Sequence, residues 1–157
     1  METASKFRIE EVNEIFAAMD QIGKYFNIRV EAVGPDFGTV VMPLEDKHLN
    51  CMHTAHGAVI FALADLAFGT AAAGRGLCCV NAQTSLNIVN PGLVSPMRAT
   101  ARIVKPGRRL MVYDVTVTDG NGGIVAKGTV TGYVKGELGA MLAEYERVEK
   151  ERAERQK

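Results

Sequence analysis

Apolar residues near the start of the chain recur three and four positions apart, which is the spacing of one helix face. The pattern predicts a single amphipathic helix that packs by this face and ends at Gly23, a residue typical of helix ends. The residues that form the pattern are Ile9, Val12, Ile15, Phe16, Met19 and Ile22.

The pattern changes to β-rich segments after this helix. Residues 27–33 and 38–44 are separated by Gly34-Pro35-Asp36, which predicts a hairpin. Further along the chain, no helical segment lies between the predicted strands, so we expect an antiparallel sheet with a helix against one face, an α+β fold. The later predicted strands are 79–90, 97–105, 109–119 and 124–136.

Between the two groups of strands lies the stretch HTAHGAVIFALADLAFGTAAAGRG, residues 53–76. It predicts a helix that is apolar on nearly every face, and such a helix in a soluble protein is expected to be enclosed. Gly74 and Gly76 mark its end. The longest apolar run, about residues 55–73, is interrupted by Asp65, so we interpret it as a buried helix and not as a membrane span.

The tail is expected to form another helix, about residues 140–155, with Glu146–Lys150 and Glu151–Arg155 as ion pairs four positions apart. We interpret it as a surface helix with one packed stripe, with an oligomer contact as the alternative. The stripe residues are Met141, Leu142, Tyr145 and Val148.

Length and charge place limits on the class of protein. The 157 residues fit one domain, 1–157, and 47% of them are hydrophobic. Eighteen basic residues balance eighteen acidic ones, so no overall field favours nucleic acid or an anionic membrane. The first residues lack the apolar core of a signal peptide, and three cysteines, an odd number, do not suggest a disulfide framework. We therefore expect a cytoplasmic protein.

Asp65 is the most unusual residue of the central helix. An unpaired charge among apolar neighbours costs free energy, so a carboxylate there indicates a partner or a function. The alternative is a carboxylate at the helix surface, or one that is hydrogen-bonded to a neighbouring strand.

Gly57 lies in the first turn of the same helix, where backbone N–H groups lack intrahelical partners and can stabilise an oxyanion. Gly57 alone is equally compatible with a role in close packing. Eight residues separate Gly57 from Asp65, about 12 Å along a helix. Both cannot contact one reacting centre from a single chain, so two antiparallel copies of the helix are expected to share a site.

Other polar residues gather just before the helix. His48, His53 and His56 could suggest a metal site, but their spacing matches no zinc motif. We expect His56 to fix the helix entry through a hydrogen bond, and Asn50 to bond the preceding link or a substrate. Cys78 and Cys79 have no histidine nearby in the sequence, so a cysteine nucleophile is disfavoured.

Lys105, Arg108 and Arg109 form a basic cluster at a predicted strand turn around Pro106-Gly107. Alone, it is typical of a solvated hairpin, and a phosphate-bearing substrate would give it a function.

These residues resemble a known family, the PaaI-like acyl-CoA thioesterases of the hotdog fold. The resemblance is carried by LNCMHTAHGAVIFALADLAFG, TSLNIVNPG and RIVKPGRRLMVYDVTVTDGNGGIVAKGTVTGYV, and it covers about residues 26–136. It implies a long helix wrapped by an antiparallel sheet, in homodimers and often homotetramers. It also implies that Asp65 acts as general base or nucleophile, from the chain opposite to the one whose Gly57 N–H polarises the carbonyl.

The same resemblance implies that Asn50 helps to place substrate or water, that Gln83 or Thr84 orients the water, and that the basic turn meets the CoA phosphates. Two positions depart from the family pattern. The usual HGG is His56-Gly57-Ala58, and Ser85 stands where many relatives carry an acidic residue.

The sequence thus predicts a homo-oligomeric acyl-CoA thioesterase that needs no metal or organic cofactor, CoA being part of its substrate, and that binds neither nucleic acid nor membrane. Alternatives are a hotdog dehydratase acting on hydroxyacyl thioesters, a non-catalytic acyl-CoA-binding module and a purely structural protein. The sequence does not determine whether the acyl group is aromatic, short or long.

Overall fold

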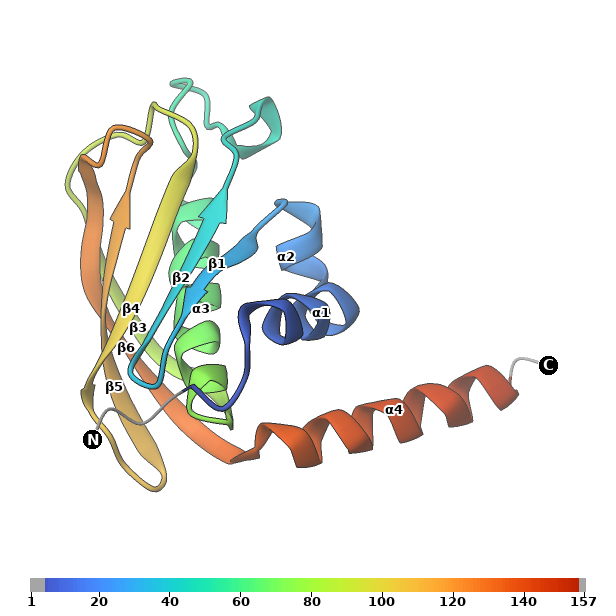
Figure 1. Ribbon diagram of the computed structural model, residues 1–157. Helices are drawn as coiled ribbons and strands as arrows, with labels where there is room; N and C mark the ends of the chain where they lie inside the picture. The colour runs from blue at the N-terminus through green and yellow to red at the C-terminus, as the bar shows by residue number, and fades with distance from the viewer. Residues whose placement is uncertain (1–4, 156–157) are drawn as a thin grey trace.

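A six-stranded antiparallel sheet packs around one long helix in the computed structural model, which describes residues 5–155 (Figure 1). The sheet order is β1-β2-β4-β5-β6-β3, and the helix, α3 (Gly57–Gly74), contacts all six strands. This is the α+β arrangement expected from the sequence. The strands are β1 (Arg29–Val33), β2 (Phe37–Met42), β3 (Leu77–Ile88), β4 (Met97–Lys105), β5 (Leu110–Thr118) and β6 (Ile124–Glu137).

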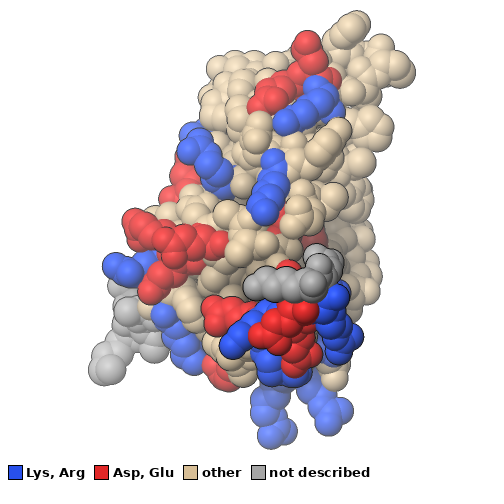
Figure 2. All heavy atoms as spheres, turned by 90° about the vertical axis from the view of Figure 1, so that its right-hand side faces the viewer, with Lys and Arg blue, Asp and Glu red and all other residues tan. Residues whose placement is uncertain are grey.

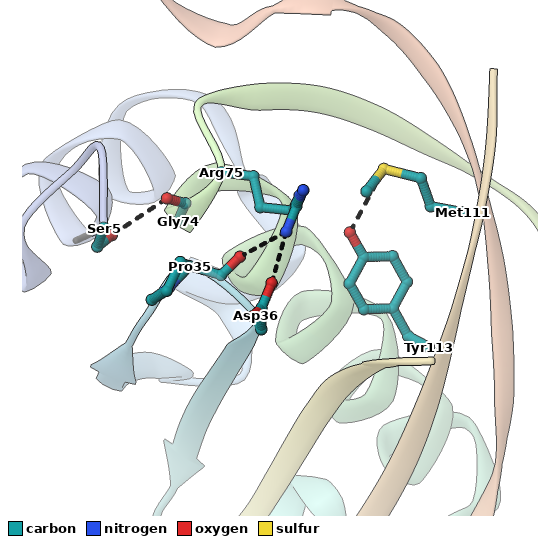
Figure 3. A network of polar contacts seen from close by, with 7 residues as sticks. All are labelled: Ser5, Pro35, Asp36, Gly74, Arg75, Met111 and Tyr113. Carbon is teal, nitrogen blue, oxygen red and sulfur yellow. Dashed lines mark hydrogen bonds and ion pairs between the residues drawn. The ribbon is translucent and has the colours of Figure 1, made fainter. Parts of the chain in front are cut away.

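The inner face of the sheet forms the core together with α3. On β5, Tyr113 and every second residue around it are buried, while Asp114 is exposed, so one face of this strand lies in the core. The Tyr113 ring meets the edge of Phe68 on α3 at 5.3 Å between centroids, and its hydroxyl donates to Met111 Sδ at 3.7 Å (Figure 3). Burial raises the pKa of Tyr113 far above its usual value, so the hydroxyl stays protonated.

The C-terminal end of α3 is tied to the β1–β2 hairpin. Arg75, the residue after the helix, donates from Nη1 to the Pro35 carbonyl at 3.2 Å and to Asp36 Oδ1 at 2.5 Å (Figure 3). Ser5 Oγ donates to the Gly74 carbonyl. Gly76 then adopts φ +74°, a left-handed conformation that suits glycine after a helix. The helix end predicted from Gly74 and Gly76 is confirmed.

By length and composition α3 could cross a membrane, but 67% of it is buried within this chain. It is therefore the core helix of the fold, as the sequence predicted.

The N-terminal helix predicted to run to Gly23 is in fact two helices, α1 (Ile9–Met19) and α2 (Gln21–Tyr25). Asp20 separates them: it is extended at φ −103° and ψ 104°, and its carboxylate caps α2 by accepting from the Gly23 N–H at 2.6 Å. Gly23 thus lies inside α2 and is buried, and a Cβ there would lie 3.0 Å from Leu66 Cδ2. Gly23 serves close packing and does not end the first helix.

The C-terminal helix, α4 (Leu138–Arg155), extends away from the sheet (Figure 1). Its packed stripe is confirmed in part: Leu142, Tyr145 and Val148 are half-buried, whereas Met141 is exposed. Tyr145 donates to the Ala18 carbonyl of α1 at 3.4 Å. The expected ion pairs are wrong, because Arg147 instead pairs with Glu144 and Glu151. Figure 2 views the molecule from the right-hand side of Figure 1. Cationic and anionic side chains are intermingled over the lower part of the face seen there, so that face carries no extended field of one sign.

His48 is buried in the link between β2 and α3, at the end of a short 3-10 turn, η1 (Asp46–His48). Its Nδ1 accepts from the Glu45 N–H at 3.0 Å, and its carbonyl accepts from the His56 N–H at 2.8 Å. Burial is the main cause that lowers the pKa of His48 below its ordinary value of 6.5, so the folded chain favours the neutral ring.

We expect the stability of the fold to depend on pH through His48. Because its pKa is lower in the folded than in the unfolded chain, its contribution is present above pH 6.5 and lost as the pH falls through the folded pKa. Urea unfolding at fixed protein concentration, from about pH 8 to pH 5.5, should show a smaller loss for His48→Gln than for the natural chain. The exposed His53 gives the control His53→Gln, and equal slopes for all three proteins would contradict the prediction.

A second prediction concerns the contact between β2 and α3 at Gly38. A Cβ at Gly38 would lie 2.4 Å from the Ala71 backbone nitrogen and 2.7 Å from Thr70 Cβ. Gly38→Ala should therefore destabilise the fold by about 1–3 kcal/mol, measured as the change in the free energy of unfolding in urea. Gly139→Ala, at a position with nothing within 4 Å, is the matched control and should not lower it. Equal effects of the two changes would contradict the prediction, because they would mean that β2 can shift away from α3 and accept the new Cβ at no cost.

Candidate functional site

One face of α3 is not covered by the sheet. Ala58, Phe61 and Asp65 are exposed, and Ala62 and Gly69 are half-buried, a spacing of three and four that forms one stripe along the helix. We call these five residues the α3 stripe. The expectation that α3 is enclosed on nearly every side is therefore wrong for the single chain, because the sheet covers only part of its circumference.

Asp65 lies in the middle of the α3 stripe, and its carboxylate contacts the neighbouring strand. Asn81 of β3 donates from Nδ2 to Asp65 Oδ1 at 2.7 Å, and the same nitrogen lies 2.6 Å from Thr84 Oγ1. Within one chain, Asp65 is thus the surface carboxylate bonded to a strand that the sequence left as the alternative. The cost of burying its charge arises only if another surface covers the α3 stripe.

A β-bulge explains how Asn81 and Thr84 come to face Asp65 together. Residues three apart on a regular strand point to opposite faces. The pairing of β3 with β6 shifts between Asn81 and Gln83, so Ala82 is an extra residue that brings both side chains to the helix face. Gln83, adjacent to Thr84, is exposed and points the other way. The sequence did not single out Asn81, because the bulge that orients it leaves no signal beyond a polar residue early in a strand.

Two hollows lie at different points along α3, both next to β3, and each holds one of the two predicted groups. A hollow of about 320 Å³ holds Asp65 together with Phe16, Asp20, Val80 and Asn81. A second of about 320 Å³ holds Gly57 together with Asn50, Ile88 and Asn90. The single chain therefore keeps Asp65 and Gly57 apart, as their separation of eight residues along the helix requires.

The N-terminus of α3 has the features of a site that stabilises negative charge. His56 is the N-cap, and its Nδ1 accepts from the Ala58 N–H at 3.0 Å, so the predicted hydrogen bond at the helix entry is present. Within residues 5–155, the Gly57 N–H donates no hydrogen bond. Gly57 lines the hollow at the positive end of the helix dipole.

Asn50 holds the turn that leads into the helix. Its Oδ1 accepts from the Met52 and Thr54 N–H groups at 2.9 and 3.2 Å, and its Nδ2 donates to Thr54 Oγ1 at 2.9 Å. The sequence predicts that Asn50 bonds either the link before the helix or a substrate, and the structure shows the bonds to the link. One Nδ2 proton remains for a ligand in the Gly57 hollow.

The histidines do not form a metal site. Among the described residues, no group of three or more His, Cys, Asp or Glu side chains is placed to hold a metal ion. His48 is enclosed under the link, while His53 and His56 are exposed. Burial raises the pKa of Cys78, and raises that of Cys79 to about 11, so both remain thiols at neutral pH.

The basic cluster lies at the β4–β5 turn, as predicted, and Lys105, Arg108 and Arg109 are all exposed. The Arg109 carbonyl accepts from the Val134 N–H, and Val134 pairs with Cys79 of β3, which lines the Asp65 hollow. The turn is thus level with this hollow and two strands away, about 10 Å at the usual strand spacing.

Comparison with known proteins identifies the family. A sequence model of the thioesterase superfamily matches residues 52–126, from the turn before α3 into β6. The acyl-coenzyme A thioesterase PaaI of Escherichia coli is 29% identical over 101 residues, which are 64% of this chain and 72% of that protein. The structure of E. coli PaaI, from the phenylacetic acid degradation operon, matches with a TM-score of 0.74 at 26% identity, over 79% of this chain and 91% of that one.

Two streptococcal structures are also similar. A Streptococcus mutans protein bound to acetyl-CoA is 32% identical with a TM-score of 0.69, over 76% of this chain and 97% of that one. A hypothetical thioesterase of Streptococcus pneumoniae with coenzyme A is 28% identical with a TM-score of 0.66, over 73% and 98% of the two chains. Taken with the sheet-wrapped helix, these matches show that the chain belongs to the thioesterase superfamily and is a PaaI-like thioester hydrolase of the hotdog fold.

Proposed function

We propose that this protein hydrolyses acyl-CoA thioesters at a site shared by two copies of the chain, with Asp65 from one copy and the Gly57 N–H from the other. The observation that carries this proposal is the division of the two groups between separate hollows on one helix. Two antiparallel α3 helices in contact through their stripes would bring the Asp65 hollow of each chain to the Gly57 hollow of its partner.

The surface around the stripe supports association. β3 is a twelve-residue edge strand, and among residues 5–155 no element pairs with its outer edge. Phe61 on α3 and Val80 and Ile88 on β3 are 40%, 48% and 46% exposed. A long, uncovered edge strand with apolar neighbours is a template for pairing with a second strand. Pairing of two β3 edges would continue the sheet and bring the two stripes together. Assembly into a tetramer remains a prediction.

The chemistry follows from the two groups. The Gly57 N–H donates to the thioester carbonyl and stabilises the negative charge that develops on its oxygen. Asp65 Oδ1 is held by Asn81, which leaves Oδ2 to accept a proton from water. The water oxygen bonds the carbonyl carbon, the C–S bond breaks, and the proton passes to the CoA sulfur. Covering of the stripe by the partner removes bulk water and strengthens both interactions.

The basic turn supports CoA as the leaving group. Lys105, Arg108 and Arg109 are free of ion pairs among the described residues, and they lie level with the Asp65 hollow. Guanidinium and ammonium groups pair well with phosphate, so this turn would hold the phosphates of CoA. The streptococcal relatives bound to acetyl-CoA and coenzyme A are consistent with this assignment. We also expect the protein to act in the cytoplasm, where its three free cysteines stay reduced.

The first test replaces the base. Asp65→Asn keeps the size of the side chain and a bond to Asn81 but cannot accept a proton from water. We expect kcat to fall about a hundredfold to ten-thousandfold, with acyl-CoA binding retained. Release of free CoA thiol and calorimetric binding measure the two effects. Asp114→Asn, at an exposed carboxylate on β5, is the control and should be unchanged. Wild-type turnover by Asp65→Asn would remove Asp65 from the mechanism. Binding without turnover by the natural chain would instead indicate a non-catalytic module.

The second test asks whether the site is shared. Gly57→Pro removes the N–H donor, and its Cβ would make an ordinary contact of 3.6 Å with Ile88 Cδ1. Proline is tolerated at the first position of a helix, and the preceding His56 already has the extended ψ of 139° that proline requires. Asp65→Asn and Gly57→Pro homodimers should both be inactive. When the two are mixed and allowed to exchange, half of the dimers carry one intact site of two, so about a quarter of wild-type activity should return. No recovery, with exchange shown by native mass spectrometry, would place the site within one chain.

A further inference from the structure

A groove larger than the Asp65 and Gly57 hollows lies next to the Asp65 hollow, on the side of α1 and α2. Its volume is about 570 Å³, within the usual range for small-molecule sites. Its apolar walls come from α1, α2 and the segments beside β1 and β2, and Lys24 and Arg29 lie at its polar margin. The apolar residues of its lining are Phe16, Ala17, Ile28 and Pro43.

Phe16 separates the groove from the Asp65 hollow, because its side chain lines both. The tip of its ring faces the α3 stripe: a Cβ at Gly69, one helical turn after Asp65, would lie 3.6 Å from Phe16 Cζ. Leu66 is the other element of the partition, since it lines the Asp65 hollow and its Cδ2 lies 3.0 Å from the Cβ position of Gly23 in the groove. Two side chains therefore stand between the carboxylate and the groove.

The walls of the groove are held in place by paired polar groups. Asn13 of α1 exchanges two hydrogen bonds with the backbone of Val30 in β1, at 3.0 and 2.8 Å. Asp20 fixes the start of α2 through the Gly23 N–H. Since α1 and α2 are thus fastened to the sheet and to each other, the groove is already formed in the free chain.

We infer that this groove seats the acyl group of the substrate and that Phe16 determines which acyl groups enter. The inference rests on the proposed function, which places the thioester carbonyl beside Asp65. The basic turn would take the CoA half of the substrate, so the acyl half must extend elsewhere. The apolar groove lies behind Phe16, next to the hollow that holds this carboxylate. An acetyl group fits the Asp65 hollow alone, whereas an extended apolar chain requires the groove beyond the ring.

The groove walls from α1, α2 and β1 lie outside residues 52–126, the part that matches the superfamily model. The reacting groups, Asp65 and Gly57, lie inside it. Acyl selectivity is therefore assigned to a segment that can vary without changing the chemistry, and Phe16 acts as a specificity-determining residue.

The test compares decanoyl-CoA with acetyl-CoA as the ratio of their kcat/KM values. Ala17→Phe fills the groove and should lower this ratio at least about tenfold, and Phe16→Ala removes the partition and should raise it. The matched control is Ala18→Phe, the same change at the next residue, which lines the separate hollow between α1 and α4. This control should leave the ratio unchanged.

The outcomes separate the groove from the proposed function. If the natural chain releases CoA thiol from no member of a panel of aryl and fatty acyl-CoAs, the proposed function fails and the groove assignment fails with it. If it hydrolyses aryl-CoAs but neither acetyl- nor decanoyl-CoA, the groove assignment alone is overturned. If the natural chain is active but neither Ala17→Phe nor Phe16→Ala alters the ratio, the groove assignment alone is overturned. A change of oligomeric state for Ala17→Phe, seen by size-exclusion chromatography, would also overturn it, because a protein surface and not an acyl chain would then cover the groove. Opposite shifts from the two variants distinguish the effect from simple loss of folding.

Discussion

The close packing of α3 against the curved sheet is the constraint on which the rest of the molecule depends. Small residues make this approach possible, as at Gly38, where no side chain could stand between β2 and the backbone of α3. The sheet surrounds the helix on most sides and contacts it through every strand. What it leaves open is a single stripe, and the proposed chemistry lies on that stripe.

The two groups of the proposed mechanism lie at different points along one helix, Gly57 in its first turn and Asp65 near its middle. The dipole and the free N–H are properties of its first turn, and they cannot be moved along the axis. Asp65 stands two turns later, held by Asn81 on the adjacent strand. Since the helix is rigid, the two groups cannot converge on one atom within a chain. Self-association is then a condition of catalysis in the proposed mechanism, and the uncovered edge of β3 offers a way to achieve it.

The elements outside the helix and the four-stranded block β3–β6 have a different role. α1 and α2 are fastened to β1 and α3 by Asn13, Asp20 and the close contact at Gly23, and they form a groove next to the carboxylate. In the proposed mechanism, the reacting groups lie on the central helix, and the groove inferred to select the acyl group lies on a separate N-terminal segment. A change in Phe16 could alter the substrate range without disturbing Asp65 or Gly57.

By itself, the sequence determined the fold class, the order of the strands along the chain, the span of α3 and the separation of Asp65 from Gly57 along that helix. Each of these follows from local periodicity or from the fixed rise of a helix, which a single chain segment encodes. The cap at His56 was likewise readable from its position before the first helical turn.

The tertiary structure decided the rest, because it depends on contacts between segments far apart in the sequence. An apolar helix pattern does not show which face the sheet leaves uncovered, so the exposure of Asp65 could not be read from its neighbours. The partner of Asp65, Asn81, is set by a bulge at Ala82 in the pairing of β3 with β6. The break at Asp20 and the groove beside Phe16 arise from the packing of α1 and α2 on α3 and β1. Local periodicity carries no information on these contacts, since each is made by a residue distant in the chain.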